Sequence, residues 1–296
     1  MSSFFVRRLG AAVLLVAALA WVGCDGDDSV SATEPDTEGS AEYPDACPAC
    51  ADGDSVAAAD LPHFSFFVTS LAALQELSGS PDGFGGDLRY GETGPGAGLR
   101  GADRICECIA ERSMPGSSVK QWRAFLSITA DENGQPVNAI DRIGAGPWYD
   151  RLGRLLAPTR ADLVPHIRPQ NGNAAIRDDL PNEDGVPNHR PDPNLPKVDN
   201  HHMLTGSDTD GTLYSTSATC GDWTTADGSS ANGRPRCGFS WPRSSRASNS
   251  GSHWVSGLNA PGCAPGVGTE GKPPAGAITV GAGGGYGGFY CFALHP

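Results

Sequence analysis

The stretch Gly98–Phe125, GLRGADRICECIAERSMPGSSVKQWRAF, decides the fold, because it joins an amphipathic helix that carries cysteines to a strongly hydrophobic strand. Four of its residues fall on one narrow stripe at 100° per residue, and this stripe is expected to face the core. These residues are Ala102, Cys106, Ile109 and Ser113. Asp103 is expected in the first helical turn, where a carboxylate meets unpaired N–H groups. Pro115 and Gly116 end the helix.

A core strand is expected directly after this helix, because Trp122–Ile128 alternates aromatic or aliphatic residues with polar ones. Within the helix, Cys108 lies about 200° around the axis from Cys106. The two thiols therefore point to opposite sides of the helix and need different partners.

The composition describes a loop-rich globular chain, since its 296 residues include 40 Gly and 24 Pro and only 19% are charged. The formal net charge of −13 is unevenly spread, because residues 24–62 hold eleven acidic residues and no Lys or Arg. After residue 62 the chain carries 23 acidic against 19 basic residues. Nucleic acid has no electrostatic support on such a surface, so no nucleic-acid partner is expected.

Residues 1–23 have the features of a signal peptide: two arginines, then an apolar run that ends at a small residue. The sequence Trp21-Val22-Gly23-Cys24 resembles the bacterial lipobox, in which the cysteine is acylated and becomes the new N-terminus. A lipid anchor at Cys24 is therefore expected, which would attach the protein to the cell envelope, at the outer membrane or surface of a Gram-negative bacterium. The alternative is ordinary signal cleavage that leaves Cys24 as a free thiol.

Residues 24–62 are expected to form an acidic, flexible tether, because they are rich in Ser and Thr and nearly free of large apolar residues. The tether contains Cys47-Pro48-Ala49-Cys50, a C-x-x-C sequence. Structural disulfides that tie the tether to the domain are favoured over a redox site, because no strand or helix is indicated around it.

Periodicity over the rest of the chain predicts a mixture of short strands, short helices and long loops. The expected elements are a strand at His63–Ser70, helical turns at Leu71–Leu77, a loop at Gly79–Gly98, a hairpin within Asn138–Val164, a flexible connection at Gly281–Gly288 and a final strand at Phe289–Leu294.

Three ordered blocks of the sequence resemble endostatin, the C-terminal domain of two vertebrate collagens. The blocks are Gly98, Arg100, Gly101, Ala102, Asp103 and Cys106 followed by residues 123–127; Gly206-Ser207-Asp208, Gly211, Cys220 and Trp223; and Cys263 with Phe289-Tyr290-Cys291. The resemblance covers about residues 63–296. The chain is also similar to endostatin-like lipoproteins of leptospires, whose domain opens with a Phe-Val-Thr-Ser strand like residues 67–70 here.

This resemblance implies an α+β fold of the C-type-lectin-like class, a single domain with long loops at residues 63–296. It also implies two disulfides, Cys106 to Cys291 and Cys220 to Cys263, of which the first stabilises by roughly 4 to 5 kcal/mol in the chain-entropy account. Four cysteines then remain, and their pairing into disulfides stays open. They are Cys47, Cys50, Cys108 and Cys237. A four-thiolate zinc site is the alternative for these residues.

Residues 165–200 form a long loop rich in Pro, Asn and Asp, which makes this loop the first candidate for ligand contact. The candidate ligand-binding residues are Asp192, Asp199, His201 and His202. Oxygen-rich loops suit calcium, and the implied fold often holds it, but the sugar-binding signatures of lectin-like domains are absent. A solvated acidic loop is therefore favoured. The two histidines lack the spacing of zinc motifs.

No catalytic triad, metal-ligand set or cofactor motif appears in the chain, so the protein is not expected to be an enzyme or to need a cofactor. The leading hypothesis is a surface-anchored binding or adhesion lipoprotein, as the resemblance implies, with an extracellular protein or a polysaccharide as its partner. A calcium-dependent carbohydrate-binding module is the second hypothesis. A metal-dependent envelope enzyme that uses His201 and His202 is the third.

Overall fold

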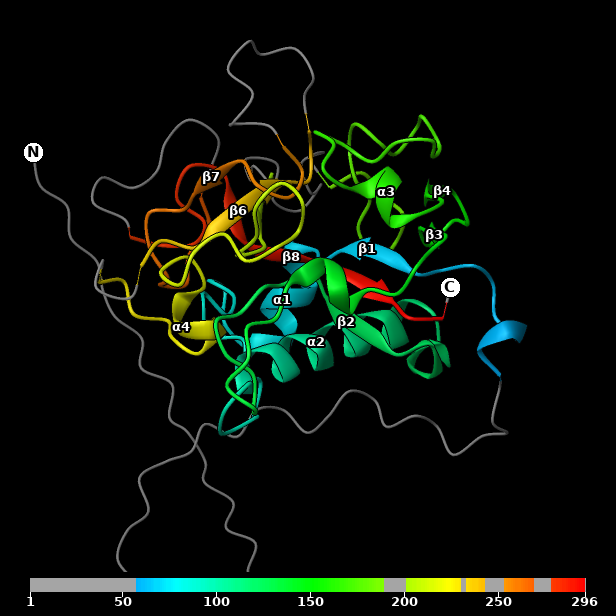
Figure 1. Ribbon diagram of the computed structural model, residues 1–296. Coiled ribbons are helices and arrows are strands. Elements are labelled where there is room, and N and C mark those ends of the chain that lie inside the picture. Colours follow the sequence, from blue (N-terminus) through cyan, green and yellow to red (C-terminus); the bar gives the residue numbers. More distant parts are fainter. Residues whose placement is uncertain (1–56, 189–200, 230–232, 243–252, 269–277, 296) are drawn as a thin grey trace, which may run out of the picture. The chain divides into compact units, whose positions relative to one another are not determined.

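The last strand, β8 (Gly285–Ala293), lies at the centre of the main sheet in the computed structural model, which describes residues 57–188, 201–229, 233–242, 253–268 and 278–295 (Figure 1). All these residues belong to one compact unit with mixed α and β structure. Every residue of β8 is buried. Aromatic side chains from this strand, Tyr290 and Phe292, pack against Phe66 and Trp254 in the core.

Both edges of β8 are paired. On one edge β1 (Phe66–Val68) runs antiparallel to it, with Phe67 opposite Cys291. Ala124 of β2 (Trp122–Ala124) is opposite the same cysteine, so β2 must lie on the other edge. The first strand of the domain is thus paired with the last one, which brings the two ends of the domain together.

The sheet continues from the first half of β8 through three more strands. β5 (His202–Leu204) runs parallel to β8, and β6 (Arg236–Phe239) and β7 (Leu258–Asn259) follow in antiparallel order, so β7 is an edge strand. The prediction of a flexible connection at Gly281–Gly288 is only partly correct, because β8 already begins at Gly285. A Cβ atom on Gly285 would lie 2.7 Å from the Cβ of His202, so the glycine lets β5 approach closely.

Two helices cover one side of the sheet (Figure 1). α1 (Leu71–Ser78) is capped at its start by the hydroxyl of Ser70 and at its end by Gly79 in the left-handed conformation. α2 (Ala97–Ser113) contains Gly98 and Gly101, where an added Cβ would lie 2.2 Å from the carbonyl oxygen of Asp222 and 2.0 Å from that of Arg89. The two glycines thus allow the close backbone packing of this helix.

The stripe predicted on α2 is buried at Ala102, Cys106 and Ile109, whereas Ser113 is half-buried. Asp103 does not lie in the first turn, because the helix begins at Ala97. It lies in the second turn, and its carboxylate is directed at β2 instead of at the helix N-terminus. Pro115 and Gly116 follow the helix end, as predicted.

The remaining elements are short. The hairpin predicted within Asn138–Val164 is confirmed by antiparallel strands β3 (Trp148–Tyr149) and β4 (Leu155–Ala157). The others are η1 (Ala58–Asp60), η2 (Ser117–Lys120), η3 (Ala139–Arg142), α3 (Arg160–Leu163) and α4 (Cys220–Trp223). The strand predicted at Trp122–Ile128 is limited to β2, because the amide of Leu126 turns back to the carbonyl of Ala124. η1 lies in the stretch assigned to the tether, and Leu61 just after it packs against the core.

Two disulfides join distant parts of the domain, and they are the pairs that the resemblance implies. Cys106 on α2 is bonded to Cys291 on β8, and Cys220 is bonded to Cys263, with Cα atoms 5.6 and 5.7 Å apart. Cys108 is disulfide-bonded as well. Cys47 and Cys50 lie outside them as well.

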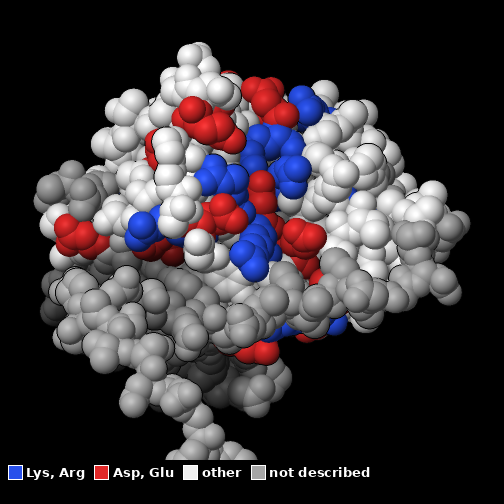
Figure 2. Space-filling view, turned by 90° about the horizontal axis from the view of Figure 1, so that it is seen from below, with Lys and Arg blue, Asp and Glu red and all other residues white. Residues whose placement is uncertain are grey.

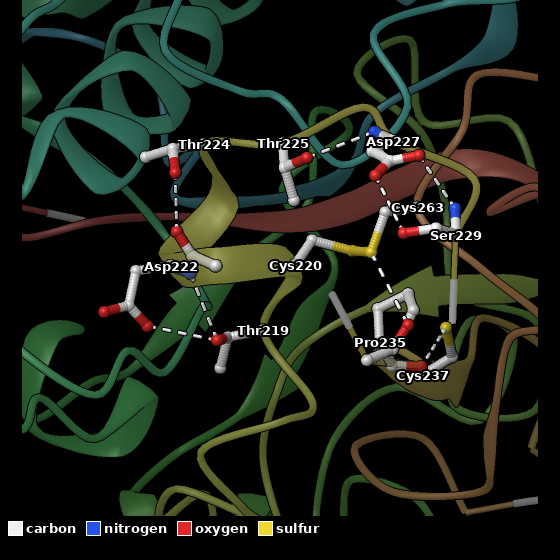
Figure 3. Close-up of a disulfide and its surroundings, with 12 residues drawn as sticks. Thr219, Cys220, Asp222, Thr224, Thr225, Asp227, Ser229, Pro235, Cys237 and Cys263 are labelled. Atoms are coloured by element: carbon white, nitrogen blue, oxygen red, sulfur yellow. Dashed lines mark hydrogen bonds between the residues drawn. A yellow bond between two sulfur atoms is a disulfide. The ribbon is translucent and has the colours of Figure 1, made fainter. Parts of the chain in front are cut away.

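Cys237 was predicted to form a disulfide, and the structure corrects this. It is a free, fully buried thiol on β6, with Sγ 3.6 Å from the carbonyl oxygen of Pro235 (Figure 3). Burial raises the pKa of this thiol to about 12. The other cysteines of the described residues are all disulfide-bonded, so none of them is available to Cys237.

The Cys220–Cys263 disulfide holds an unusual turn (Figure 3). In α4, the non-glycine residues Cys220, Asp222 and Trp223 have φ angles of 49°, 59° and 63°, a left-handed conformation that L-residues rarely adopt. Besides the disulfide, the carboxylate of Asp222 accepts a hydrogen bond from the amide of Thr129 at 2.7 Å, and the ring of Trp223 is fully buried. These attachments compensate for the cost of the conformation.

Within the described ranges, no helix has the length and apolar character needed to cross a membrane.

Candidate functional site

The first part of the loop predicted to contact ligand is packed onto the domain. The amide of Leu180 donates to the carbonyl of Ser240 at 2.7 Å, and Pro181 accepts from the amide of Val68 at 2.9 Å. The side chains of Ile176 and Leu180 are fully buried. The expectation of a solvated acidic loop is therefore only partly correct for residues 165–188, because Glu183 is buried whereas Asp184 is exposed. Asp192 and Asp199 lie outside the described residues.

The predicted histidines are in the described part of the chain, but they pack against an aromatic ring. His201 stacks on Phe239 with ring centroids 4.7 Å apart, and the ring of His202 stands edge-on to the ring of His201, with centroids 4.2 Å apart. His202 is the first residue of β5, and its side chain is buried in the sheet. Over the described ranges, no group of three His, Cys, Asp or Glu side chains is placed to hold a metal ion.

A cleft of about 820 Å³ lies along the exposed side of α2, bordered by β2 and by the turn at residues 131–135. Side chains of both charges interleave on this face (Figure 2). The charged residues that line the cleft are Glu92, Arg100, Asp103, Arg104, Glu107, Arg123, Asp131, Glu132 and Arg142. The cleft therefore has no dominant charge.

The floor of the cleft is a buried ion pair. The carboxylate of Asp103 accepts hydrogen bonds from Nη2 of Arg142 at 2.6 Å and from the amide of Ala124 at 2.8 Å. Arg142 also donates to the carbonyl of Ala124. Burial raises the pKa of Asp103, while the Arg142 guanidinium opposes this shift. The pair joins α2, β2 and η3, so its first role is structural.

The walls of the cleft carry charged groups that the protein leaves available. Glu107 and Glu132 make no hydrogen bond or ion pair with any described residue, and burial raises the pKa of Glu107. Arg123 uses Nη1 for the carbonyl of Trp122, and its Nε is 3.7 Å from Asp103. In contrast, Arg100 is fully engaged, because it donates to the carboxylate of Glu92 and to the carbonyl oxygens of Thr93 and Pro95.

A second feature, which sequence reasoning missed, is the buried carboxyl group of Glu183. It accepts hydrogen bonds from the amide of Ser70 at 3.0 Å and from the Ser70 hydroxyl at 2.5 Å, at the start of α1. It lines a small pocket of about 220 Å³ with Glu76 and Arg112. Burial raises the pKa of Glu183 from 4.5 to about 7, an effect that the hydrogen bonds from Ser70 only partly offset.

Glu183 is expected to make stability depend on pH. Between pH 4.5 and about 7 the folded protein holds a proton that the unfolded chain has lost, so stability falls as pH rises through this window, by roughly 3 kcal/mol. Glu183→Gln keeps an acceptor for the Ser70 amide and does not titrate, and its NH2 group can donate to the Ser70 hydroxyl, which then accepts instead of donating. The variant should be more stable than the wild type at pH 8 and about equal to it at pH 4.5, as measured by urea unfolding.

The free energy of unfolding is compared between variant and wild type at each pH, because His253 changes the stability of both proteins with pH in the opposite direction. Burial lowers the pKa of His253 to about 4, so its contribution rises with pH between 4 and 6.5. Asp82→Asn removes an exposed carboxylate that does not act on Glu183, so it is the control and should leave the curve unchanged. A Glu183→Gln curve parallel to the wild-type curve would contradict the assignment.

No protein-family model matches this chain, and no curated protein matches it.

Proposed function

We propose that the protein is a surface-anchored, non-enzymatic recognition module, held at the cell envelope through Cys24, whose C-type-lectin-like domain binds an extracellular protein in the cleft along α2. Three features support the proposed fold class: the paired first and last strands, the disulfide from α2 to β8, and the high proportion of loop. The endostatin-like sequence blocks support it as well.

The observation that carries the proposal is the mixed charge of the cleft. Asp103 and Arg142 are engaged with each other and with backbone, whereas Glu107, Glu132 and part of Arg123 remain available. A polyanion such as heparin would meet the available carboxylates and be repelled. A protein surface with both charges is the complementary partner, since interleaved charges select register and orientation.

Charge reversal in the cleft tests this proposal. Glu107→Lys combined with Arg123→Glu keeps the net charge but exchanges the signs, so binding of a complementary protein should weaken at least tenfold, about 1.4 kcal/mol. The full-length protein would be assayed by biolayer interferometry against immobilised collagen, fibronectin and laminin, at low and high salt.

Arg234→Glu is the control, because Arg234 is exposed and does not line the cleft. It should bind like the wild type. If the wild type binds none of these proteins, or if the cleft variant binds as tightly as the wild type, the proposed function is wrong.

A further inference from the structure

Three acidic residues of α2 are spaced four positions apart, so they lie on one side of the helix: Asp103, Glu107 and Glu111. The outer two are engaged. Asp103 belongs to the buried ion pair of the cleft floor, and Glu111 accepts hydrogen bonds from two backbone amides of the turn at residues 116–118, at 2.6 and 2.9 Å. Glu107, between them, is half-buried and makes no hydrogen bond or ion pair with any described residue.

Arg123 on β2 is the closest source of positive charge that remains available to a ligand beside Glu107. Its neighbours Trp122 and Ala124 are buried, so the side chain of Arg123 points out of the core and lines the cleft. Within the described residues, Nη1 donates to the carbonyl of Trp122, Nε is 3.7 Å from Asp103, and Nη2 makes no hydrogen bond.

The two groups lie near each other without forming an ion pair. Burial raises the pKa of Glu107, and the charge of Arg123 is near enough to oppose this shift. Arg123 instead makes its ion pair with Asp103, one helical turn away from Glu107, and 36% of the Arg123 side chain is exposed. The cleft thus presents an open carboxylate and an open guanidinium edge side by side.

This arrangement is complementary to a small ligand that carries both charges. A simple anion would be repelled by Glu107, and a simple cation would be repelled by Arg123. A ligand with an ammonium group and a carboxylate a few bonds apart would instead form a charge-assisted hydrogen bond with each residue. The half-buried position of Glu107 favours such bonds, because water competes with them less.

We infer that Glu107 and Arg123 bind the zwitterionic group of an amino acid, in which an ammonium and a carboxylate share one carbon. The inference rests on the cleft being a binding site, as the proposed function does, but it adds a second class of ligand. Two sources supply this group at a cell envelope: free amino acids, and the diamino acid in the stem peptides of peptidoglycan, whose side chain ends in such a group.

Isothermal titration calorimetry of the full-length protein with meso-diaminopimelate tests the inference. Pimelate, which lacks the amino groups, and cadaverine, which lacks the carboxylates, are matched analogues with the same carbon spacing. The wild type should bind meso-diaminopimelate. Each analogue should bind roughly tenfold more weakly or worse, because it leaves one charged group of the site without a partner.

Variants assign the binding to the two residues. Glu107→Gln and Arg123→Gln should each weaken binding of meso-diaminopimelate roughly tenfold or more. Glu76→Gln and Arg234→Gln replace residues of the same types that do not line the cleft, and they should bind like the wild type. Near-UV circular dichroism of each variant checks the fold.

Sedimentation with isolated peptidoglycan sacculi distinguishes the two sources. If the wild type sediments with sacculi and Glu107→Gln does not, the ligand is the cell-wall peptide. If meso-diaminopimelate binds in solution but the wild type does not sediment with sacculi, the ligand is a free amino acid. Both results support a site for the zwitterionic group.

Three results would overturn the inference: meso-diaminopimelate does not bind the wild type, pimelate or cadaverine binds as tightly as meso-diaminopimelate, or Glu107→Gln binds as tightly as the wild type. The outcome is separate from that of the protein-binding experiment. Failure to bind collagen, fibronectin or laminin does not affect a titration with a small molecule, and protein binding without binding of meso-diaminopimelate rejects this inference alone.

Discussion

Replacement of both Cys106 and Cys291 by serine is expected to lower the free energy of unfolding by roughly 5 kcal/mol. The bond joins residues 185 positions apart, so its removal greatly increases the conformational freedom of the unfolded chain. Both sulfur atoms are also fully buried, between α2 and the central strand. Serine would place hydroxyl groups at these buried positions, and the cost of burying them adds to the loss of stability.

Urea unfolding of the full-length variant under oxidising conditions measures this effect. Cys237→Ala is the matched control, because it removes a buried thiol without breaking a disulfide, and its cost should stay near 1 kcal/mol. A reductant should lower the stability of the wild type more than that of the double variant. If the double variant unfolds at the wild-type urea concentration, the bond is not a main source of stability.

Asp103→Asn is expected to lower the free energy of unfolding by about 3 kcal/mol, because it leaves the guanidinium of Arg142 buried without a counter-charge. Only 11% of the Arg142 side chain and 17% of the Asp103 side chain are exposed, so water replaces the lost carboxylate poorly. An asparagine oxygen still accepts from the amide of Ala124, and the loss therefore reports the ion pair rather than the backbone contact.

An exposed ion pair provides the control for Asp103. Glu76 lies 3.0 Å from Arg112 with 67% of its side chain exposed, and Glu76→Gln should cost less than about 1 kcal/mol. Double replacement of Asp103 and Arg142 by asparagine and methionine should recover part of the loss, since no unpaired charge remains. If Asp103→Asn and Glu76→Gln lower the free energy of unfolding by the same amount, burial does not make the loss of one partner of the ion pair more costly.

Local patterns were sufficient for several elements. The turns of α1 and α2, the hairpin of β3 and β4, and strand β1 follow from periodicity and from glycine and proline positions, all of which act over a few residues. The strand expected at Trp122–Ile128 was too long, because the chain turns after Ala124 to follow its neighbours, and a hydrophobic run does not encode that turn.

Residues with a chemical role were harder to place from the sequence. Asp103 was assigned to a helix N-terminus, yet it binds Arg142, 39 residues later. Glu183 lies in the stretch that the sequence predicts to be a solvated acidic loop, yet it is buried against Ser70, 113 residues earlier. The free state of Cys237 and the stacking of Arg236 on Tyr214 likewise depend on neighbours brought together by the sheet.

Short-range pattern thus predicted the mixture of helices and strands and most element positions, because helix periodicity and turn chemistry are local properties. The pairing of the cysteines that close the domain came instead from the resemblance to endostatin. Burial, pKa and pairing were determined by folding, because each depends on which remote segments exclude water from a side chain. The cleft and the buried carboxyl group of Glu183 are both of this second kind, and only the three-dimensional arrangement identifies them.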